Sequence, residues 1–409
     1  DFGQNYLNSM DAKGNPVIFT NGDNDTFPLW YNQETEGVRT DARVCNLSYL
    51  QTDWYIDQMR RPAYDSPSLP ISWTRLQYVT GTREGIPVQP DALQQVIDYY
   101  KDSPEDLKQM LGDNPYELKN IIRHWVLNDN PDLQIFPTDS IVVTVDKEAV
   151  KRSGMMIAAD SIPDVMHISL KGKRAVYKSE MMMLEMISQA NWERPLYMST
   201  TVGPDNYGHL GDNFVQEGLA CRITPFDTKQ SGRTIDSERM YNNMMNKFKY
   251  GGLKENPDIY LDETVIRMCY THRRLFNQLA QQLLKEGQKD KALKVLQRAE
   301  EEIPGSIVPH EAFYGHSLEL ADAWLALGHK AEAEKLLNAV GQNAREYIEW
   351  YLSLNTQRLL QSSRECLMQI YILNDIAKTW EPIDKKKAET YRMEVNNYAS
   401  RCHQRGMSL

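Results

Sequence analysis

The sequence predicts an α/β domain at residues 1–250 followed by an all-α domain at residues 258–409. In the first part, short apolar and β-branched runs alternate with helical patterns, which is typical of α/β domains. Beyond the break at Gly251-Gly252, the hydrophobic spacing is helical almost without interruption. With 409 residues the chain is also longer than one hydrophobic core usually supports, so more than one domain is expected.

The first domain is expected to contain a mostly parallel, Rossmann-like sheet. Several strand candidates are almost entirely apolar, as strands are when a parallel sheet is buried on both faces. The candidates are residues 17–20, 43–47, 141–145, 166–169, 196–199 and 218–223. If the first two strands are parallel neighbours, the loops that follow them emerge at the same edge of the sheet.

Two segments interrupt this alternation. Residues 88–130 predict a helical insertion, whose helices break at Ser-Pro and Asn-Pro steps. Residues 201–211 are polar and glycine-rich, and we expect a loop that either covers a ligand or has no special role. His209 lies in this loop without a visible partner, so it is a weak candidate for a functional residue.

The second domain contains a repeat of small and apolar residues at helical spacing. The two copies lie 41 residues apart, as Ala280 and Ala321 do. The first copy comprises Phe276, Leu279, Ala280, Leu283, Gly287, Ala292, Leu296, Ala299 and Pro304, and the second comprises Leu320, Ala321, Trp324, Gly328, Ala333, Leu337 and Val340. These positions resemble the tetratricopeptide repeat, whose usual length of about 34 residues requires an insertion at residues 307–315. Such arrays commonly bind protein segments; the alternative is a helical cap that only packs on the first domain.

Composition and motif spacing disfavour several classes of function. The formal charge of −10, with dispersed lysine and arginine, gives no electrostatic reason to bind nucleic acid. No stretch approaches the roughly 20 apolar residues that cross a bilayer, so we expect this part of the protein not to span the membrane. The five cysteines and eight histidines lack the spacing of a zinc site or a redox motif. No methionine or leader precedes Asp1, and we expect a piece of a longer protein.

The candidate ligand-binding residues follow the first two expected strands. An acidic, Gly-led turn comes after residues 17–20, and a second acidic and aromatic segment comes after residues 43–47. The candidates are Asp23, Asn24, Asp25, Thr26, Trp30, Asp53, Trp54 and Tyr55. Loops at the carboxyl ends of neighbouring strands are where α/β folds bind ligands. The alternative is structural, with Asp25 or Thr26 capping a helix that Pro28 helps to start.

Carboxylates beside aromatic rings fit two kinds of ligand. Acidic groups accept hydrogen bonds from sugar hydroxyls while a ring covers the apolar face of a pyranose, and they also bind calcium or magnesium. If a metal binds, Asp23 and Asp25 are its expected ligands; no other cofactor is expected. No calcium-loop, phosphate-loop or G-x-S-x-G motif occurs. An acid and base pair of Asp25 with Asp53 stays open, because it requires environments that separate their pKa values.

Three segments carry a resemblance to a known family. They are FTNGDNDTFPLWY at residues 19–31, RTDARVCNLSYLQTDWYIDQM at residues 39–59 and ANWERPLYMST at residues 190–200. With the tetratricopeptide-like tail, they resemble the soluble C-terminal part of bacterial membrane proteins classified under a domain of unknown function. The membrane-spanning N-terminal half of those proteins is related to protein O-mannosyltransferases.

The resemblance implies a periplasmic, extracytoplasmic location, with the chain tethered to the membrane by a region before Asp1. It also implies that the parent protein is a glycosyltransferase whose catalytic acid lies in the membrane half, so no catalytic residue is assigned here. We therefore expect a module that recognises a glycan or polypeptide acceptor and contacts protein partners and its own membrane half. One alternative is a metal-assisted hydrolase or transferase that uses the acidic loops. Another is a pure protein–protein scaffold.

Overall fold

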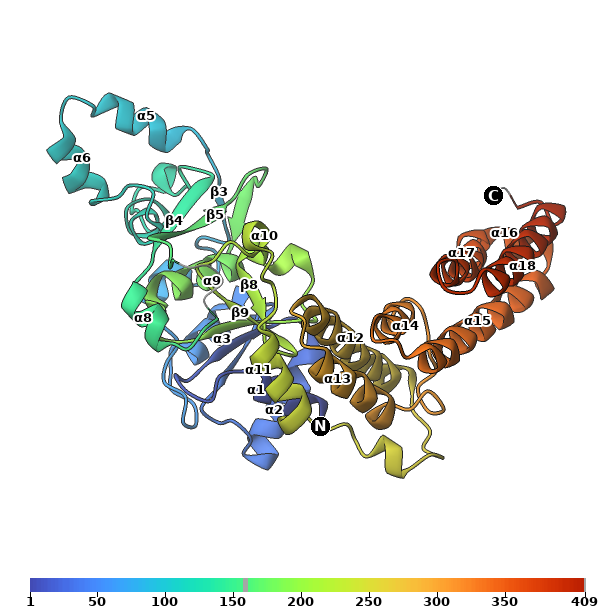
Figure 1. Cartoon of the computed structure of the whole chain (residues 1–409). Helices are drawn as coiled ribbons and strands as arrows, with labels where there is room; N and C mark the ends of the chain where they lie inside the picture. Colours follow the sequence, from blue (N-terminus) through green and yellow to red (C-terminus); the bar gives the residue numbers. More distant parts are fainter. Residues whose placement is uncertain (157–160, 408–409) are drawn as a thin grey trace. The chain divides into compact units, whose positions relative to one another are not determined.

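The structure is a computed structural model that describes residues 1–156 and 161–407 (Figure 1). The chain divides into two compact units, Asp1–Lys249 and Tyr250–Leu409, which we call unit 1 and unit 2. Unit 1 combines sheets and helices, and unit 2 is helical, which confirms the predicted order of a mixed part followed by an all-α part.

The main sheet of unit 1 has five strands in the order β2-β1-β7-β9-β8. Its strands are β1 (Val17–Thr20), β2 (Arg43–Asn46), β7 (Leu196–Ser199), β8 (Phe214–Gln216) and β9 (Ala220–Ile223). Strand β1 pairs in parallel with β2 and β7, whereas β9 pairs antiparallel with both β7 and β8. The sheet is therefore mixed, with two parallel and two antiparallel pairings, whereas the sequence predicted a mostly parallel, Rossmann-like sheet. The reason is the short turn between β8 and β9, which can only join antiparallel strands.

Two of the predicted strands belong to a separate ribbon. Strands β4 (Ser140–Thr144) and β5 (Val165–Ser169) pair antiparallel with each other and alternate buried with exposed residues, so only one face of this ribbon packs on the core. A second small ribbon pairs β3 (Gly85–Pro87) with β6 (Ala175–Tyr177), which the sequence did not indicate.

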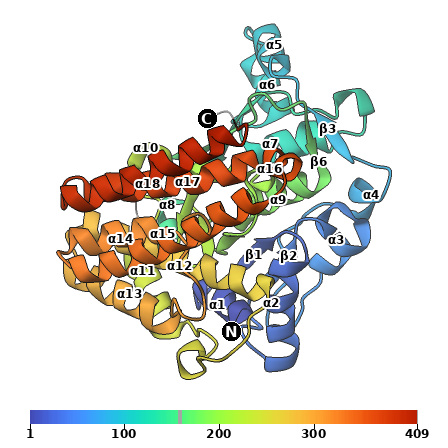
Figure 2. The ribbon, with the colours of Figure 1, turned by 90° about the vertical axis from the view of Figure 1, so that its right-hand side faces the viewer.

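The helices of unit 1 surround the main sheet and the two ribbons. They are α1 (Phe2–Ser9), α2 (Asp23–Glu36), α3 (Asp53–Met59), α4 (Arg75–Tyr78), α5 (Ala92–Tyr99), α6 (Pro104–Leu111), α7 (Leu118–Ile121), α8 (Lys147–Arg152), α9 (Lys178–Ala190), α10 (Thr228–Ser231) and α11 (Ser237–Asn242). Helices α1 and α2 pack together beside β1 and β2 (Figure 2). Helix α9 buries the methionines 181–183 and 186 in the core, where their flexible side chains fill space.

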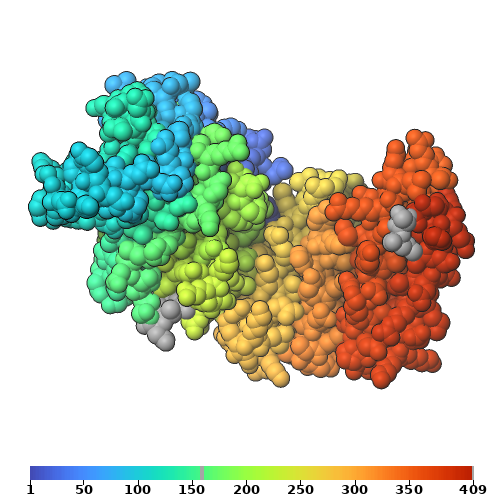
Figure 3. Space-filling view, turned by 90° about the horizontal axis from the view of Figure 1, so that it is seen from above, coloured from blue at the N-terminus to red at the C-terminus, as the bar shows by residue number. Residues whose placement is uncertain are grey.

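Helices α5 and α6 lie away from the main sheet (Figure 1) and form a lobe that protrudes from the rest of unit 1, cyan in Figure 3. A small apolar cluster of its own holds this lobe together. The buried members of the cluster are Leu93, Leu111, Trp125 and Ile135. A π-helical turn, Ile122–Val126, continues α7 and places Trp125 in this cluster.

Unit 2 consists of helices packed as antiparallel neighbours. They are α12 (Glu263–Lys285), α13 (Lys289–Glu302), α14 (Ser317–Ala326), α15 (Lys330–Ser353), α16 (Thr356–Gln361), α17 (Ser363–Trp380) and α18 (Lys385–Gln404). The main packed pairs are α12 with α13, α14 with α15, and α17 with α15 and α18, the last three lying side by side in Figure 2.

The alanine residues of the repeat lie in the interior of the first two helix pairs. Ala280, Ala292, Ala321 and Ala333 are fully buried. Gly287 follows the end of α12 with a φ of +74°, a backbone conformation that favours glycine. Helix α15 has 24 residues against 14 in α13, so the two pairs are unequal. Among the described residues, no helix combines the length and the apolar composition needed to cross a bilayer.

Candidate functional site

The two candidate loops meet at one edge of the main sheet. Strands β1 and β2 are parallel neighbours in a register that pairs Thr20 with Asn46, the last residues of both strands. The loop after β1 leads into α2 through Gly22, whose φ of +83° favours glycine. The loop after β2 leads into α3. Helix α2 begins at Asp23, so Pro28 lies inside it and not at its start.

Thr26 ties the two loops together and has no spare hydrogen-bonding group. Its hydroxyl donates to the carbonyl of Gly22 at 2.6 Å, lies 2.8 Å from the hydroxyl of Thr20 and accepts from the side-chain amide of Asn46 at 2.8 Å. Thr26 is fully buried. It therefore acts in the structure of the edge and does not present a group to a ligand.

Asp25 faces the end of β7. Its Oδ2 accepts hydrogen bonds from the backbone of Asn21 at 3.1 Å, from Thr201 at 3.0 Å and from Ser199 at 3.5 Å. Asp25 is 4 % exposed, and burial raises the pKa of its carboxyl group, against the opposing effect of these hydrogen bonds. Asp23 and Asn24, in the same turn, are exposed to solvent.

Asp53 interacts with a different part of unit 1, the segment of residues 75–80. It accepts a hydrogen bond from the backbone of Thr80 at 3.4 Å and forms an ion pair with Arg75 at 3.6 Å. The hydrogen bond from Thr80 is the main reason that the pKa of Asp53 is lowered. Arg75 also pairs with Asp57, one turn further along α3. In the described residues no hydrogen bond joins Asp25 to Asp53, because one carboxylate points to β7 and the other to α4.

Aromatic rings do gather at this edge. Phe27, Trp30 and Tyr49 follow one another at centroid distances of 5.7 and 6.3 Å in stacked orientation. Tyr49 in turn contacts Trp54 at 5.9 Å and Tyr55 at 5.7 Å. We call these five residues the aromatic edge. Trp54 is 50 % exposed whereas Tyr55 is buried, its hydroxyl accepting from the backbone amide of Asn46 at 2.9 Å.

A cavity of about 560 Å³, which we call the Trp30 cavity, adjoins the aromatic edge. Aromatic, aliphatic and polar residues all contribute to its lining. It is lined by Trp30, Gln33, Glu34, Ala42, Arg43, Val44, Tyr55, Gln58, Met59, Arg61, Pro62, Ala63 and Tyr64. Two of the candidate residues, Trp30 and Tyr55, belong to this lining, and Asp25 and Asp53 do not. Sequence reasoning missed the remaining members, although residues 39–59 were part of a motif quoted for the family resemblance.

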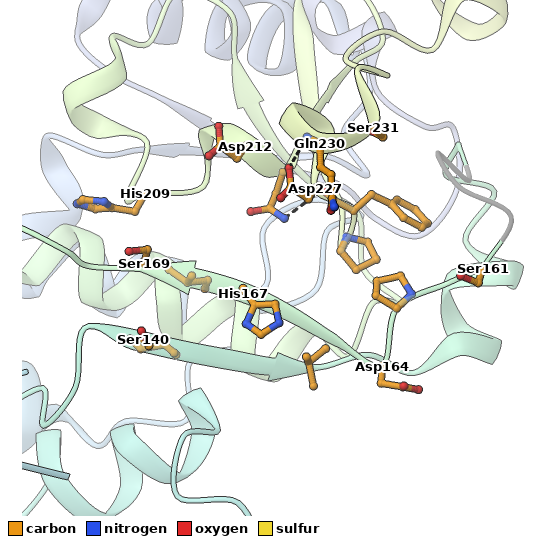
Figure 4. A pocket seen from close by; sticks show the side chains of 17 residues that line it. Ser140, Ser161, Asp164, His167, Ser169, His209, Asp212, Asp227, Gln230 and Ser231 are labelled. Carbon is orange, nitrogen blue, oxygen red and sulfur yellow. Dashed lines mark hydrogen bonds between the residues drawn. The ribbon is translucent and has the colours of Figure 1, made fainter. Parts of the chain in front are cut away.

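A larger cavity of about 760 Å³ lies between the β4–β5 ribbon and the segment of residues 209–231 (Figure 4). His167 of β5 and His209 are among its lining residues. Burial, and secondarily the charge of Lys173, lowers the pKa of His209. Asp227 in this lining caps α10 by accepting from the backbone of Gln230 at 2.8 Å. The loop of residues 201–211 thus contributes to a cavity, and His209 stands at its rim.

A metal ion would need a group of ligands that the described chain does not assemble. Within residues 1–156 and 161–407, no three His, Cys, Asp or Glu side chains lie together in a way that could hold one.

The fold and the site define unit 1 as a mixed α/β module with an aromatic edge and an adjoining cavity of mixed apolar and polar lining. A family model, TMEM260-associated domain 2, matches residues 1–243, which is more than half of the chain. The chain therefore belongs to the family of TMEM260-associated domains, a family associated with a membrane protein. Comparisons with curated proteins and with solved structures gave no match.

Proposed function

We propose that this chain is the extracytoplasmic module of a membrane glycosyltransferase-like protein related to protein O-mannosyltransferases. In this proposal unit 1 recognises a glycan in the Trp30 cavity, and unit 2 contacts a polypeptide partner. Membership of the TMEM260-associated family supports the link to a membrane protein. The resemblance of residues 19–31, 39–59 and 190–200 supports the link to glycosyl transfer and the location outside the cytoplasm.

The single observation that supports glycan binding is the lining of the Trp30 cavity. Its volume of about 560 Å³ falls within the roughly 300–1,000 Å³ of pockets that hold small molecules. Trp30, Tyr55 and Tyr64 supply aromatic surface, and Gln33, Glu34 and Gln58 supply polar groups around it. Aromatic surface suits the apolar face of a sugar ring, and polar side chains suit its hydroxyl groups.

Exposed aromatic residues on α15 support the polypeptide contact of unit 2. Tyr347 and Trp350 are 46 % and 54 % exposed, and their spacing of three residues places them on one face of the helix. Aromatic side chains are enriched at protein interfaces because they bury a large area with few rotatable bonds. The resemblance of residues 276–304 and 320–340 to the tetratricopeptide repeat is in keeping with such a role.

The test is binding of the chain to a panel of neutral and acidic oligosaccharides, followed by calorimetry on those that bind. Replacing Trp30 with alanine should weaken binding at least about tenfold, or ~1.4 kcal/mol, since the ring is lost from the cavity. Trp350→Ala in unit 2 is the matched control, because it removes the same side chain elsewhere, and it should leave glycan binding unchanged. Equal glycan binding by Trp30→Ala and the unaltered protein would remove the cavity from the proposal.

A further inference from the structure

The Trp30 cavity is lined by a buried arginine that forms no ion pair in the described part of the chain. Arg43, the first residue of β2, is 7 % exposed. Its Nη2 donates to the carbonyls of Gln58 at 2.8 Å and Arg61 at 2.9 Å. Its Nη1 is buried and has no hydrogen-bond partner among the described residues. The guanidinium therefore retains unused donors beside a cavity that its side chain lines.

The charge of Arg43 is not compensated from nearby. Within the described part of the chain Arg43 forms no ion pair, and Glu34 is the one acidic residue of the cavity lining. The carboxylate of Glu34 accepts a hydrogen bond from Tyr64, another residue of the lining, and this bond is the main cause of the raised pKa of that tyrosine.

Other cations add to the positive potential around Arg43. Arg61 also lines the cavity. The pKa of Arg194 is lowered to about 10, mainly because the side chain is removed from water and secondarily because of the nearby positive charge of Arg43. Among the described residues, Arg194 donates to Ser66 and to backbone carbonyls, including that of Asn15 at 2.7 Å. Arg43 is thus buried and Arg194 half-buried, and in the described part of the chain neither of them forms an ion pair with a carboxylate.

Such an arrangement is costly unless an opposite charge accompanies it. A buried charge is usually paired with an opposite charge or fully hydrogen-bonded, because removing it from water is otherwise unfavourable. A planar guanidinium with free donors matches the two oxygens of a carboxylate or a phosphate better than it matches a neutral hydroxyl. An anionic ligand would supply the acceptor that Arg43 lacks.

We propose that the Trp30 cavity binds a sugar that carries an anionic group, a carboxylate or a phosphate, with that group on Arg43 and the ring against Trp30. The inference rests on the proposed glycan function and adds the charge of the ligand to it. The anion neutralises the surplus positive charge of the cavity, so an acidic sugar binds more tightly than the neutral sugar of the same shape.

The experiment compares four probes on the whole chain by calorimetry at low salt: glucose, glucuronate, glucose 6-phosphate and inorganic phosphate. Glucuronate or glucose 6-phosphate should bind at least about tenfold more tightly than glucose, and 0.5 M sodium chloride should reduce this preference by screening. Arg43→Gln should abolish the preference while it keeps weak binding of glucose. Arg267→Gln, which removes an exposed arginine of unit 2, is the matched control and should retain the preference.

Each outcome decides between the two proposals. Equal binding of glucose and both acidic sugars overturns the anionic site and leaves glycan recognition intact. Binding of inorganic phosphate as tight as that of glucose 6-phosphate shows an anion site without a sugar subsite and also overturns the inference. If no sugar binds at all, the proposed function itself fails. Should Arg43→Gln not fold, the preference of the unaltered protein and its salt dependence decide the question, with Arg61→Gln as the second cavity variant.

Discussion

Tyr197 donates its hydroxyl hydrogen to Oε2 of Glu217 at 2.8 Å, and both residues are fully buried in unit 1. The other carboxylate oxygen of Glu217 lies 3.8 Å from Arg222 and 3.6 Å from Arg239. Both arginines also pair with Asp11, at 3.4 and 2.9 Å. This cluster joins β7, β9 and α11 to the segment after α1, so it holds the strand that ends beside Asp25 against the rest of the unit.

The first prediction concerns the pH dependence that Glu217 gives to stability. Burial raises the pKa of this carboxyl group from 4.5 to about 7, although the two arginines oppose the shift. Between these values the folded protein holds a proton that the unfolded chain has released, so the free energy of unfolding falls as the pH rises through this window. The decrease attributable to Glu217 should amount to about 3 kcal/mol.

Urea unfolding between pH 4 and 8 measures this effect. In Glu217→Gln the side chain does not titrate, so the variant should gain stability relative to the unaltered protein as the pH rises from about 4.5 to 7, with no further change above it. Glu238→Gln, at an exposed position of α11, is the control and should follow the pH profile of the unaltered protein. Parallel profiles for Glu217→Gln and the unaltered protein would contradict the prediction.

The second prediction compares the contributions to stability of two neighbouring polar residues, the buried Asp25 and the exposed Asn24. Asp25→Ala leaves the hydroxyl of Thr201 and the backbone amide of Asn21 without their acceptor, and unfolding should become easier by about 1–3 kcal/mol. Asn24→Ala changes an exposed neighbour, and its effect should stay within about 0.5 kcal/mol. Thermal and urea unfolding of both variants provide the comparison, and an equal effect at the two positions would contradict it.

The sequence located six strands, namely β1, β2, β4, β5, β7 and β9, but most of their pairing could not be predicted. Runs such as that of β1 are apolar because both faces of the strand are buried, and this signal is local. The direction of pairing depends on residues far apart, as in the antiparallel pairing of Tyr197 with Arg222. Hydrophobic runs therefore identified β4 and β5 as strands but not as a separate ribbon.

The site was predictable to a similar degree. The meeting of the two loops followed from the adjacency of β1 and β2, but the partners of each acid did not. Asp25 is held by Thr201, 176 residues away, and no local pattern indicates that contact. Tyr49 and Arg43 were also missed, because a single tyrosine or a strand arginine has no distinctive spacing. Their roles arise from the rings and carbonyl groups that the fold places around them.

The third prediction tests whether glycine is needed at a position because of its backbone conformation or because a larger side chain would not fit there. A Cβ atom at Gly287 would meet nothing within 4 Å, and yet its φ is +74°. Gly287→Ala should therefore destabilise unit 2 by about 1–2 kcal/mol, the cost of the left-handed conformation. Gly203→Ala also enters open space, but at an ordinary φ, and should be neutral or slightly stabilising. Thermal unfolding followed by circular dichroism distinguishes the two, and a neutral Gly287→Ala would contradict the prediction.

The fourth prediction follows from the contact of Cys366 in α17 with Cys402 in α18. Their sulfur atoms lie 3.9 Å apart and both residues are fully buried. A rotation of both side chains could bring the sulfurs to the bond length of about 2.05 Å. In an oxidising compartment we expect a disulfide here, which should stabilise the chain by about 2–4 kcal/mol. Unfolding with and without a reductant measures this gain.

We expect this disulfide to form while the chain folds and only slowly once the helices are packed. Burial raises the pKa of the Cys366 thiol to about 12, so the thiolate that attacks an oxidant is scarce once the helices are packed. Folded, reduced protein should therefore react slowly, whereas protein refolded under oxidising conditions should contain the bond, as peptide mass spectrometry without reductant would detect. Cys402→Ser should lose the stabilisation and Cys269→Ser, at a half-buried position of α12, should keep it. Two free thiols at positions 366 and 402 after oxidative refolding would show that the helix packing keeps the sulfurs apart.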